Sequence, residues 1–201
     1  MFGIGLDETY EVAVYEDFAI DVRPGDLVFV TGPSGSGKSV LLARLVEAMR
    51  ADQGPIVDLA AIALPADRSV IDGLPCPFER GLELLSSAGL ADAFLCLRRP
   101  DELSDGQRWR LRLAHALCEC GMRPSAVLVA DEFCSTLDRL SARAIAYRVR
   151  RLATRHGLTV VAASAHDDIL EDLDPDVLVV KHEGQEAEVA YRDNERQVAP
   201  R

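Results

Sequence analysis

The segment that decides the fold is Gly32-Pro33-Ser34-Gly35-Ser36-Gly37-Lys38-Ser39. It fits the pattern G-x-x-x-x-G-K-[ST] at every position. An apolar run from Leu27 to Val30 precedes it, and a helical pattern that begins near Gly37 follows it. Strand, glycine-rich loop and helix in this order are the setting in which such a loop binds phosphate.

The chemistry of this loop follows from its residue types. The glycines let successive backbone N–H groups point inward, and the helix N-terminus adds a partial positive charge. Lys38 can reach the β- and γ-phosphates of a nucleotide, and the Ser39 hydroxyl can ligate Mg²⁺. We therefore expect the residues from Gly32 through Val40 to bind a nucleoside triphosphate. The alternative is a Gly/Ser-rich turn without a ligand, which leaves the complete pattern unexplained.

Two carboxylates and a histidine follow later apolar runs. Asp131 and Glu132 end a strand that begins at Val127, and a buried parallel strand delivers such residues to the ligand edge of its sheet. Asp131 is expected to hold Mg²⁺, and Glu132 to polarise the water that attacks the γ-phosphate. His166 follows another apolar run, and a neutral imidazole there can contact the γ-phosphate. The alternatives are an acidic strand end and a surface histidine.

The remaining pattern predicts an α/β fold, namely a P-loop NTPase with a mainly parallel central sheet. Apolar strands alternate with helices, which places helices on both faces of the sheet. The strands are predicted at 11–18, 19–22, 27–30, 126–130, 158–163 and 177–180. Helices are predicted after residue 37, at 78–87, 105–120 and 139–155, and in a short acidic segment before residue 177. The opening strands predict an N-terminal antiparallel β extension.

Two further motifs complete the set. Leu103-Ser104-Asp105-Gly106-Gln107 precedes an amphipathic helix, and Ser135-Thr136-Leu137-Asp138 follows the acid pair. With the phosphate-binding loop, the 127–132 strand and His166, they resemble the P-loop, signature, Walker B, D-loop and switch histidine of ABC-type ATPases. The motifs occur in the family's order and extend over nearly the whole chain.

This resemblance implies a homodimer that forms on ATP binding. Ser104, Asp105, Gly106 and Gln107 of one copy would face the γ-phosphate that Lys38 of the other copy holds. The loop at Asp138 would communicate across the interface. ATP and Mg²⁺ are the implied ligands, with Glu132, His166 and Lys38 in the catalytic roles and Ser39 and Asp131 as metal ligands. An aromatic residue of the opening strands stacks on adenine in this family, and Tyr10 is the candidate.

The sequence departs from the family pattern at several points. Asp105 replaces the first glycine of the usual L-S-G-G-Q. The interval between Lys38 and Ser104 is short, which predicts a single domain with a core lobe of residues 1–67 and 122–201 and a shortened helical lobe of residues 68–121. No glutamine lies in the 63–68 segment, where the family's Q-loop glutamine is expected. Phe133 stands where transporters usually have proline.

Composition limits the partners. Of 201 residues, 33 are acidic and 22 basic, and the net charge of −11 disfavours nucleic acid, although Arg108, Arg112 and His115 can share one helix face. Trp109 lies beside this strip and either stacks on a base or packs. No leader or membrane segment is apparent and the five cysteines lack metal-site spacing, which predicts a cytoplasmic protein with reduced thiols.

These departures favour one function over three others. The leading hypothesis is a soluble ABC-type ATPase, similar to those fused to acetyltransferase or ParB-like domains, whose ATP-driven dimerisation acts as a switch on an unknown protein or nucleic-acid partner. The first alternative is the ATP-binding subunit of a membrane transporter, for which the missing glutamine makes a permease partner less favoured. The others are a P-loop small-molecule kinase and a binding module that scarcely hydrolyses.

Overall fold

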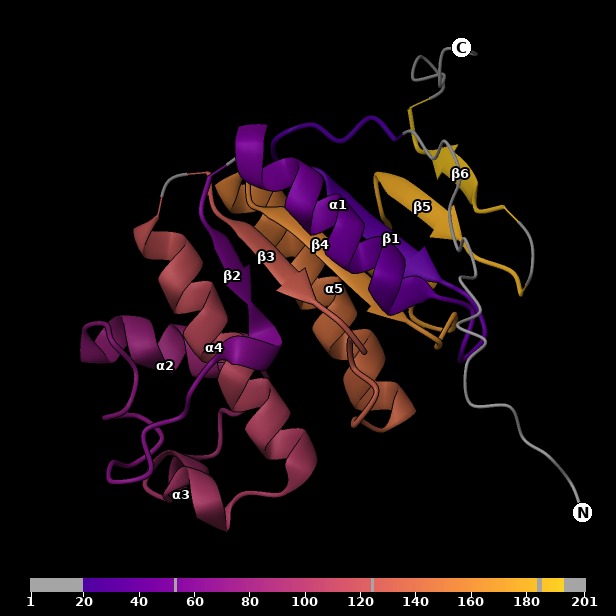
Figure 1. The fold of residues 1–201 in the computed structure, drawn as a ribbon. Helices are drawn as coiled ribbons and strands as arrows, with labels where there is room; N and C mark the ends of the chain where they lie inside the picture. The colour runs from indigo at the N-terminus through magenta and orange to yellow at the C-terminus, as the bar shows by residue number, and fades with distance from the viewer. Residues whose placement is uncertain (1–19, 53, 124, 184–185, 194–201) are drawn as a thin grey trace, which may run out of the picture.

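The computed structural model describes residues 20–52, 54–123, 125–183 and 186–193. Its centre is one sheet with the strand order β2-β3-β4-β1-β5-β6 (Figure 1). Every neighbouring pair is parallel except β5 and β6, which are antiparallel. The strands are β1 (Leu27–Thr31), β2 (Ile56–Asp58), β3 (Val127–Ala130), β4 (Thr159–Ser164), β5 (Val177–Val180) and β6 (Glu188–Tyr191).

The helices connect these strands in the order that the periodicity predicts. They are α1 (Lys38–Asp52), α2 (Phe78–Ser87), α3 (Ala93–Cys96), α4 (Asp105–Met122), α5 (Arg139–His156) and α6 (Leu170–Leu173), with 3₁₀ turns η1 (Leu59–Ala61) and η2 (Pro100–Glu102). The predicted mainly parallel α/β fold is therefore confirmed. The helix predicted at 78–87 has the bounds of α2.

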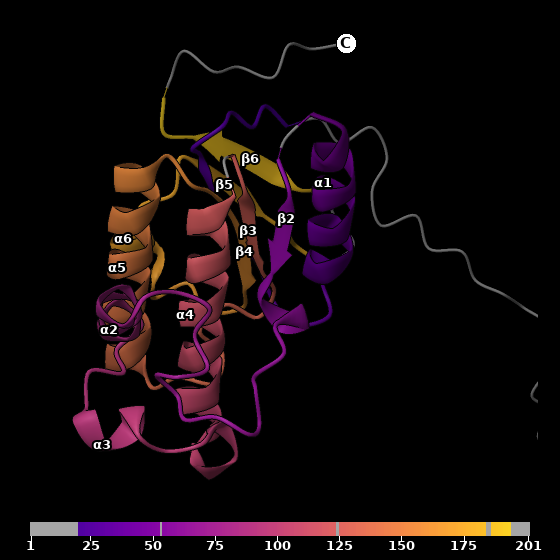
Figure 2. The ribbon, with the colours of Figure 1, turned by 90° about the vertical axis from the view of Figure 1, so that its left-hand side faces the viewer.

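Alternation along the strands explains why helices cover both faces. Val28 and Val30 of β1 pack with the apolar side chains of α1, whereas Leu27 and Phe29 pack on the opposite side with those of α4 and α5. Successive side chains of a strand point to opposite faces, so a strand buried on both faces is apolar throughout. Viewed nearly along the sheet, α1 lies on one side and α4, α5 and α6 lie on the other (Figure 2).

The antiparallel part of the sheet comes from the C-terminal side of the described chain. β6 pairs with β5, with Val177 opposite Tyr191. The predicted N-terminal strands fall mainly on residues 1–19, outside the described residues, and residues 20–22 form no strand. The sequence did not predict β6, because its four residues, Glu-Val-Ala-Tyr, are too few to show a period.

The segment between β2 and α4 is helical and lies beside the sheet. α2 packs against α4, and α3 lies at the end of this layer (Figures 1 and 2). Leu84 and Leu85 of α2 are buried in the same core as Leu111 of α4. The boundaries of the two predicted lobes stay a prediction.

Candidate nucleotide-binding site

The candidate site lies where three neighbouring strands end. β4 lies between β1 and β3, with Thr31 opposite Ser164 and Ala130 opposite Ala162. Because parallel strands end at the same edge of a sheet, the segments after them meet there. The 32–39 loop follows β1, the acid pair follows β3 and His166 follows β4. The fold thus brings these three predicted groups to one edge.

The loop begins at a glycine that no other residue could replace without rearrangement. Gly32 has φ +147°, and a Cβ added there would lie 2.0 Å from the carbonyl oxygen of Lys181. The Lys181 N–H also donates to the Thr31 carbonyl at 2.8 Å, so β5 leaves the sheet directly against the loop. Lys181 is buried. The sequence pattern identified Gly32, but only the fold shows that Lys181 presses on it.

The inside of the loop has the chemistry that a phosphate requires. Lys38 Nζ donates to the Gly32 and Pro33 carbonyls at 2.8 and 2.6 Å, which holds the ammonium over the loop. The Ser36 hydroxyl is buried and has no hydrogen-bond partner among the residues that the structure describes. A buried hydroxyl without a partner is costly, and a phosphate oxygen would satisfy it. Gly35 and Gly37, with φ +81° and +94°, form the turn into α1.

The remaining predicted loop residues line the surface. Pro33, Ser34, Gly35, Ser39 and Val40 are exposed. Lys38 is the first residue of α1, so Ser39 and Val40 lie in its first turn, where backbone N–H groups are free to bind an anion.

The donor set fits Mg²⁺. The Ser39 hydroxyl lies in the first turn of α1, and the carboxylate of Asp131, which is half-buried, follows β3. Oxygen ligands of this kind are those that Mg²⁺ prefers, and it usually completes its shell with water and substrate phosphates. In the described part of the chain no group of three or more His, Cys, Asp or Glu side chains could hold a metal alone.

Glu132 is exposed and has an unusual backbone conformation. Its φ is +49°, in the left-handed region that residues other than glycine seldom adopt. Its N–H donates to Asp131 Oδ1 at 2.9 Å. His166 is also exposed, and its N–H donates to the buried Ser164 hydroxyl at 3.2 Å. Both side chains are free to meet a ligand, and their catalytic roles stay predictions.

The signature segment begins α4 with a capping box. The Ser104 hydroxyl accepts from the Gln107 N–H at 3.3 Å, and Gln107 Oε1 accepts from the Ser104 N–H at 3.0 Å. The Ser104 hydroxyl keeps its own proton, which it can donate to an anion. Gly106 contacts the D-loop of the same chain, since an added Cβ would lie 3.1 Å from the Thr136 carbonyl oxygen.

The structure gives Asp105 a partner. Its exposed carboxylate forms an ion pair with Arg108, three residues further along α4. The guanidinium neutralises the carboxylate that replaces the family's glycine. Arg108, Arg112 and His115 do not form an open basic strip, because His115 is buried and burial lowers the pKa of its imidazole. Without His115 the predicted strip is reduced to the two half-buried arginines, and nucleic-acid contact stays a prediction.

The D-loop is held by its own helix. Asp138 is the N-cap of α5, and its carboxylate accepts from the Ser141 N–H at 3.0 Å. Hydrogen bonds from Ser141 hold the pKa of Asp138 below its usual range. Cys134 is buried, and burial raises the pKa of its thiol, so this thiol stays protonated. Tyr10, the predicted adenine contact, lies outside the described residues.

The fold and this edge define a P-loop nucleotide-binding protein with the ABC arrangement of motifs. A family model described as ABC transporter matches residues 15–73. The chain is 31% identical to the aliphatic sulfonates import ATP-binding protein SsuB 1 of Rhodococcus jostii (strain RHA1) over 183 residues, which cover 82% of this chain and 71% of that protein. The chain belongs to the ABC transporter family of ATP-binding proteins, and is an ABC-type ATPase that uses ATP with Mg²⁺.

Further comparisons agree with this family assignment. The thiamine import ATP-binding protein ThiQ of Vibrio parahaemolyticus is 29% identical over 187 residues, 79% of this chain and 77% of that protein. The zinc import ATP-binding protein ZnuC of Ruegeria pomeroyi is 31% identical over 169 residues, which cover 77% of this chain and 63% of that protein. A dimeric structure of the ATP-binding cassette MJ0796 with ADP and Pi has a TM-score of 0.66 at 19% identity, covering 90% of this chain and 94% of that chain.

These relatives correct the preferred subfamily. All three curated relatives are named as import ATP-binding proteins, and the comparisons give no support to a soluble, non-transporter subfamily. The missing glutamine and the short insert both lie in the segment between β2 and α4, outside the sheet edge that carries the phosphate-binding loop, the acid pair and His166. No helix in the described part of the chain is long and apolar enough to cross a bilayer.

Proposed function

We propose that this chain is the ATP-binding subunit of an ABC importer, and that two copies enclose two ATP molecules. The observation that carries the proposal is the shared sheet edge, where Lys38, Glu132 and His166 follow three neighbouring parallel strands. The names of the relatives add the import role. The residues at this edge have three tasks: to bind the phosphates, to hold the metal and to position a water.

In the proposed mechanism, each group acts from its place in the fold. Lys38 turns from the loop carbonyls to the β- and γ-phosphates, and the buried Ser36 hydroxyl donates to a phosphate oxygen. Ser39 and Asp131 would hold Mg²⁺, which would neutralise phosphate charge when bound. Glu132 accepts a proton from the attacking water, and His166 contacts the γ-phosphate.

The second copy completes the site. Ser104 and Gly106 lie at the N-terminus of α4, an 18-residue helix whose free N–H groups and partial charge favour an anion. Placed over the γ-phosphate of the partner, this helix end would exclude water from the reacting group. Release of phosphate removes the anion between the two copies, which opens the dimer. Tyr10 remains the proposed adenine contact.

An exposed apolar patch supports a permease partner. The name refers to four apolar side chains of this layer that are 41–79% exposed: Phe78 and Leu82 of α2, Phe94 of α3, and Leu97, which follows α3. We infer that these side chains belong to one surface, because large exposed apolar areas mark interaction sites. The segment that carries the patch is the one that lies beside the sheet, away from α1 (Figure 2).

A soluble switch remains the second candidate function. The observation that favours it is the 63–68 segment, Ala-Leu-Pro-Ala-Asp-Arg, which has no glutamine where the family's link to a permease is expected. In that case the apolar patch on α2 and α3 would bind a soluble protein.

The hydrolysis test compares wild type with Glu132→Gln. We expect wild type to release phosphate from ATP, and the variant to lose at least about 100-fold in rate, because a general base contributes that much or more. The variant should also elute as an ATP-dependent dimer. Glu79→Gln, an exposed glutamate on α2, is the matched control. Equal rates for Glu132→Gln and wild type would refute the role of Glu132.

The partner test uses membrane vesicles of the native host that have been stripped of peripheral proteins. We expect saturable binding of wild type, its loss on treating the vesicles with protease, and its loss in a Phe94→Glu/Leu97→Glu variant. Tyr147→Glu, half-exposed on α5 and outside the patch, should bind as wild type does. Absence of wild-type binding, with ATPase activity intact, would instead favour the soluble switch.

A further inference from the structure

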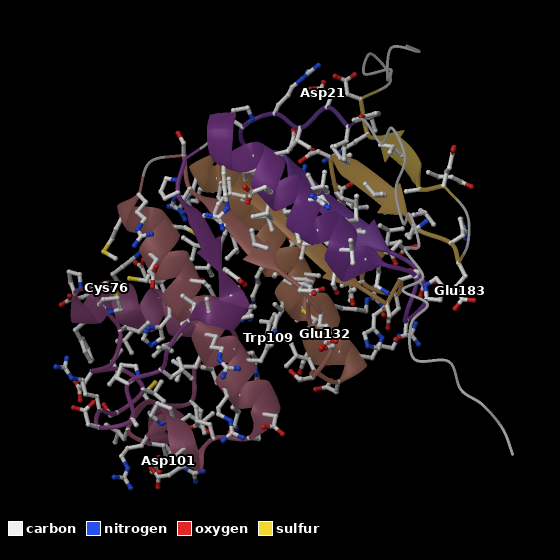
Figure 3. All side chains as sticks on the ribbon, viewed as in Figure 1. Asp21, Cys76, Asp101, Trp109, Glu132 and Glu183 are labelled. Atoms are coloured by element: carbon white, nitrogen blue, oxygen red, sulfur yellow. The ribbon has the colours of Figure 1, made fainter. Side chains whose placement is uncertain are left out.

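The signature helix contacts the catalytic loop within one chain through an aromatic pair. Trp109 lies in the second turn of α4, and its ring meets that of Phe133 edge-on, with centroids 5.6 Å apart and an interplanar angle of 71°. Both rings are buried, with Phe133 wholly so. Figure 3 shows Trp109 beside Glu132, the residue that precedes Phe133. Burial excludes base stacking by Trp109, so the alternative of a packing role is confirmed.

Phe133 lies between two residues in strained conformations. Glu132 has φ +49° and Cys134 has φ +61°. Left-handed conformations persist in such residues only where the surroundings hold them. Here the Phe133 N–H donates to the Ala163 carbonyl at 2.7 Å, and the Phe133 ring is enclosed in the core. The direction of the Glu132 side chain therefore depends on how firmly Phe133 is held.

A second contact joins the same two segments. Gly106 approaches the Thr136 carbonyl oxygen and the Leu137 side chain so closely that a Cβ would lie 3.1 and 3.2 Å from them. The first two turns of α4 therefore touch the 133–137 segment at two points. A shift of α4 would move Phe133 as well as Ser104.

We propose that Trp109 and Phe133 are positioning residues, which set the orientation of Glu132 according to the position of α4. An edge-to-face pair has a preferred geometry and few rotatable bonds, so it transmits a displacement that an aliphatic contact would absorb. The carboxylate that polarises water in one site is thus linked to the signature loop that the same chain presents to the other site. This inference rests on the proposed catalytic role of Glu132.

The test compares Trp109→Leu with Trp109→Phe. Both keep an apolar side chain in α4, but only phenylalanine keeps a ring edge against Phe133. We expect Trp109→Leu to lower kcat about tenfold or more with KM for ATP within about twofold, since a small misplacement of a reacting group is sufficient. Trp109→Phe should keep most of the wild-type kcat. Phe133→Leu should behave as Trp109→Leu does.

A control separates positioning from general packing. Leu117 is buried two turns further along α4, where it lines a cavity of about 270 Å³ with Leu84 and Leu152. Leu117→Ala should lower the melting temperature while kcat, measured well below that temperature, stays close to wild type. If Leu117→Ala and Trp109→Leu reduce kcat equally, or if folded Trp109→Leu keeps the wild-type kcat, the inference is overturned.

Fluorescence gives a readout without turnover. Trp109 is the only tryptophan of the chain, so its emission reports on this contact alone. In Glu132→Gln, addition of ATP and Mg²⁺ should shift or quench the emission, and the added substitution Phe133→Leu should abolish the response. An unchanged emission on ATP binding would contradict the link. The proposed function fails separately, if wild type releases no phosphate or if Glu132→Gln matches it.

Discussion

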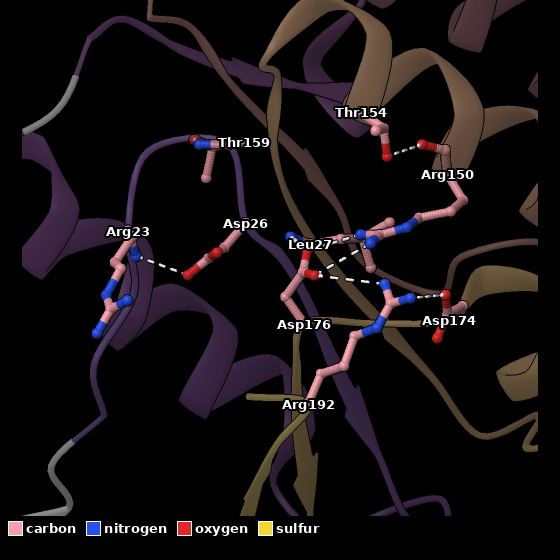
Figure 4. Close-up of polar contacts among 10 residues, drawn as sticks. Arg23, Asp26, Leu27, Arg150, Thr154, Thr159, Asp174, Asp176 and Arg192 are labelled. Carbon is pink, nitrogen blue, oxygen red and sulfur yellow. Dashed lines mark hydrogen bonds and ion pairs between the residues drawn. The ribbon is translucent and has the colours of Figure 1, made fainter. Parts of the chain in front are cut away.

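Replacement of Asp176 by asparagine tests what holds α5 to the sheet at the edge opposite the nucleotide loop. Arg150 of α5 donates to the two carboxylate oxygens of Asp176 at 2.6 and 3.0 Å (Figure 4). Asp176 also accepts from the N–H of Leu27, the first residue of β1, at 2.9 Å. Arg192 Nη1 lies 3.7 Å from Asp176 Oδ1. The carboxylate thus joins a helix, the strand that leads into the loop and the end of β6.

The expected loss of stability follows from how far the Arg150–Asp176 ion pair is buried. The side chains of Arg150 and Asp176 are 17% and 21% exposed. Breaking a fully buried pair costs about 3–5 kcal/mol, whereas an exposed pair contributes about 0–1 kcal/mol. For this mostly buried, two-pronged pair we expect Asp176→Asn to lower the free energy of unfolding by about 2–3 kcal/mol at pH 7. In a chain of this length that lowers the melting temperature by about 5–10 °C.

The effect of Asp176→Asn on the free energy of unfolding should become smaller as the pH falls. Burial alone would raise the pKa of Asp176, but hydrogen bonds from Arg150 and Leu27, with the charges of Arg150 and Arg192, hold the pKa below its usual value. The folded protein therefore binds this proton less tightly than the unfolded chain. The stabilisation is complete above the unfolded pKa of about 3.9 and is lost as the pH falls through the folded pKa.

The assay is urea denaturation followed by circular dichroism at pH 7 and at pH 3.5. The difference between wild type and Asp176→Asn should be smaller at pH 3.5, because wild type begins to lose the interaction there. Glu83→Gln, which breaks the exposed Arg80–Glu83 pair, is the control and should change stability by less than about 0.5 kcal/mol. A similarly small effect of Asp176→Asn at pH 7, or a difference that grows on acidification, would refute the reasoning.

Two predictions concern the nucleotide. Gly32→Ala should weaken ATP binding at least about tenfold in a titration with a fluorescent analogue, because the new Cβ would overlap the Lys181 carbonyl oxygen and the resulting shift of the loop would misplace the groups that bind phosphate. Gly35→Ala, with open space around the new Cβ, should weaken ATP binding less. Equal affinities of the two variants for the analogue would contradict this prediction. Arg108→Gln should weaken ATP-dependent dimerisation in Glu132→Gln by up to about fivefold, because Asp105 loses its partner. Adding Asp105→Asn to the Arg108→Gln variant should restore dimerisation. If dimerisation does not recover, repulsion between the Asp105 carboxylate and the phosphate is not the cause of the loss.

Local chemistry let the sequence predict the core of this protein. The P-loop lies between β1 and α1 because glycines, lysine and an apolar run specify a strand, a turn and a helix over a few neighbouring residues. The bounds of α2 and β5 also match the prediction, since apolar spacing alone marks them. β2 and α3 lie in the irregular, proline-rich segment, and at three and four residues they are too short to show a period.

The candidate site could be predicted only in part from the sequence. The sequence supplied the residue types at the sheet edge, because their spacing from the strand ends is local. Only the tertiary structure placed Lys181 against Gly32 and Trp109 against Phe133, because these residues are far apart in the chain and meet only when the sheet and the helical layer pack. It also buried His115, which a helical projection alone had placed with exposed arginines. Periodicity identifies a face of a helix, but packing decides whether that face meets water or the core.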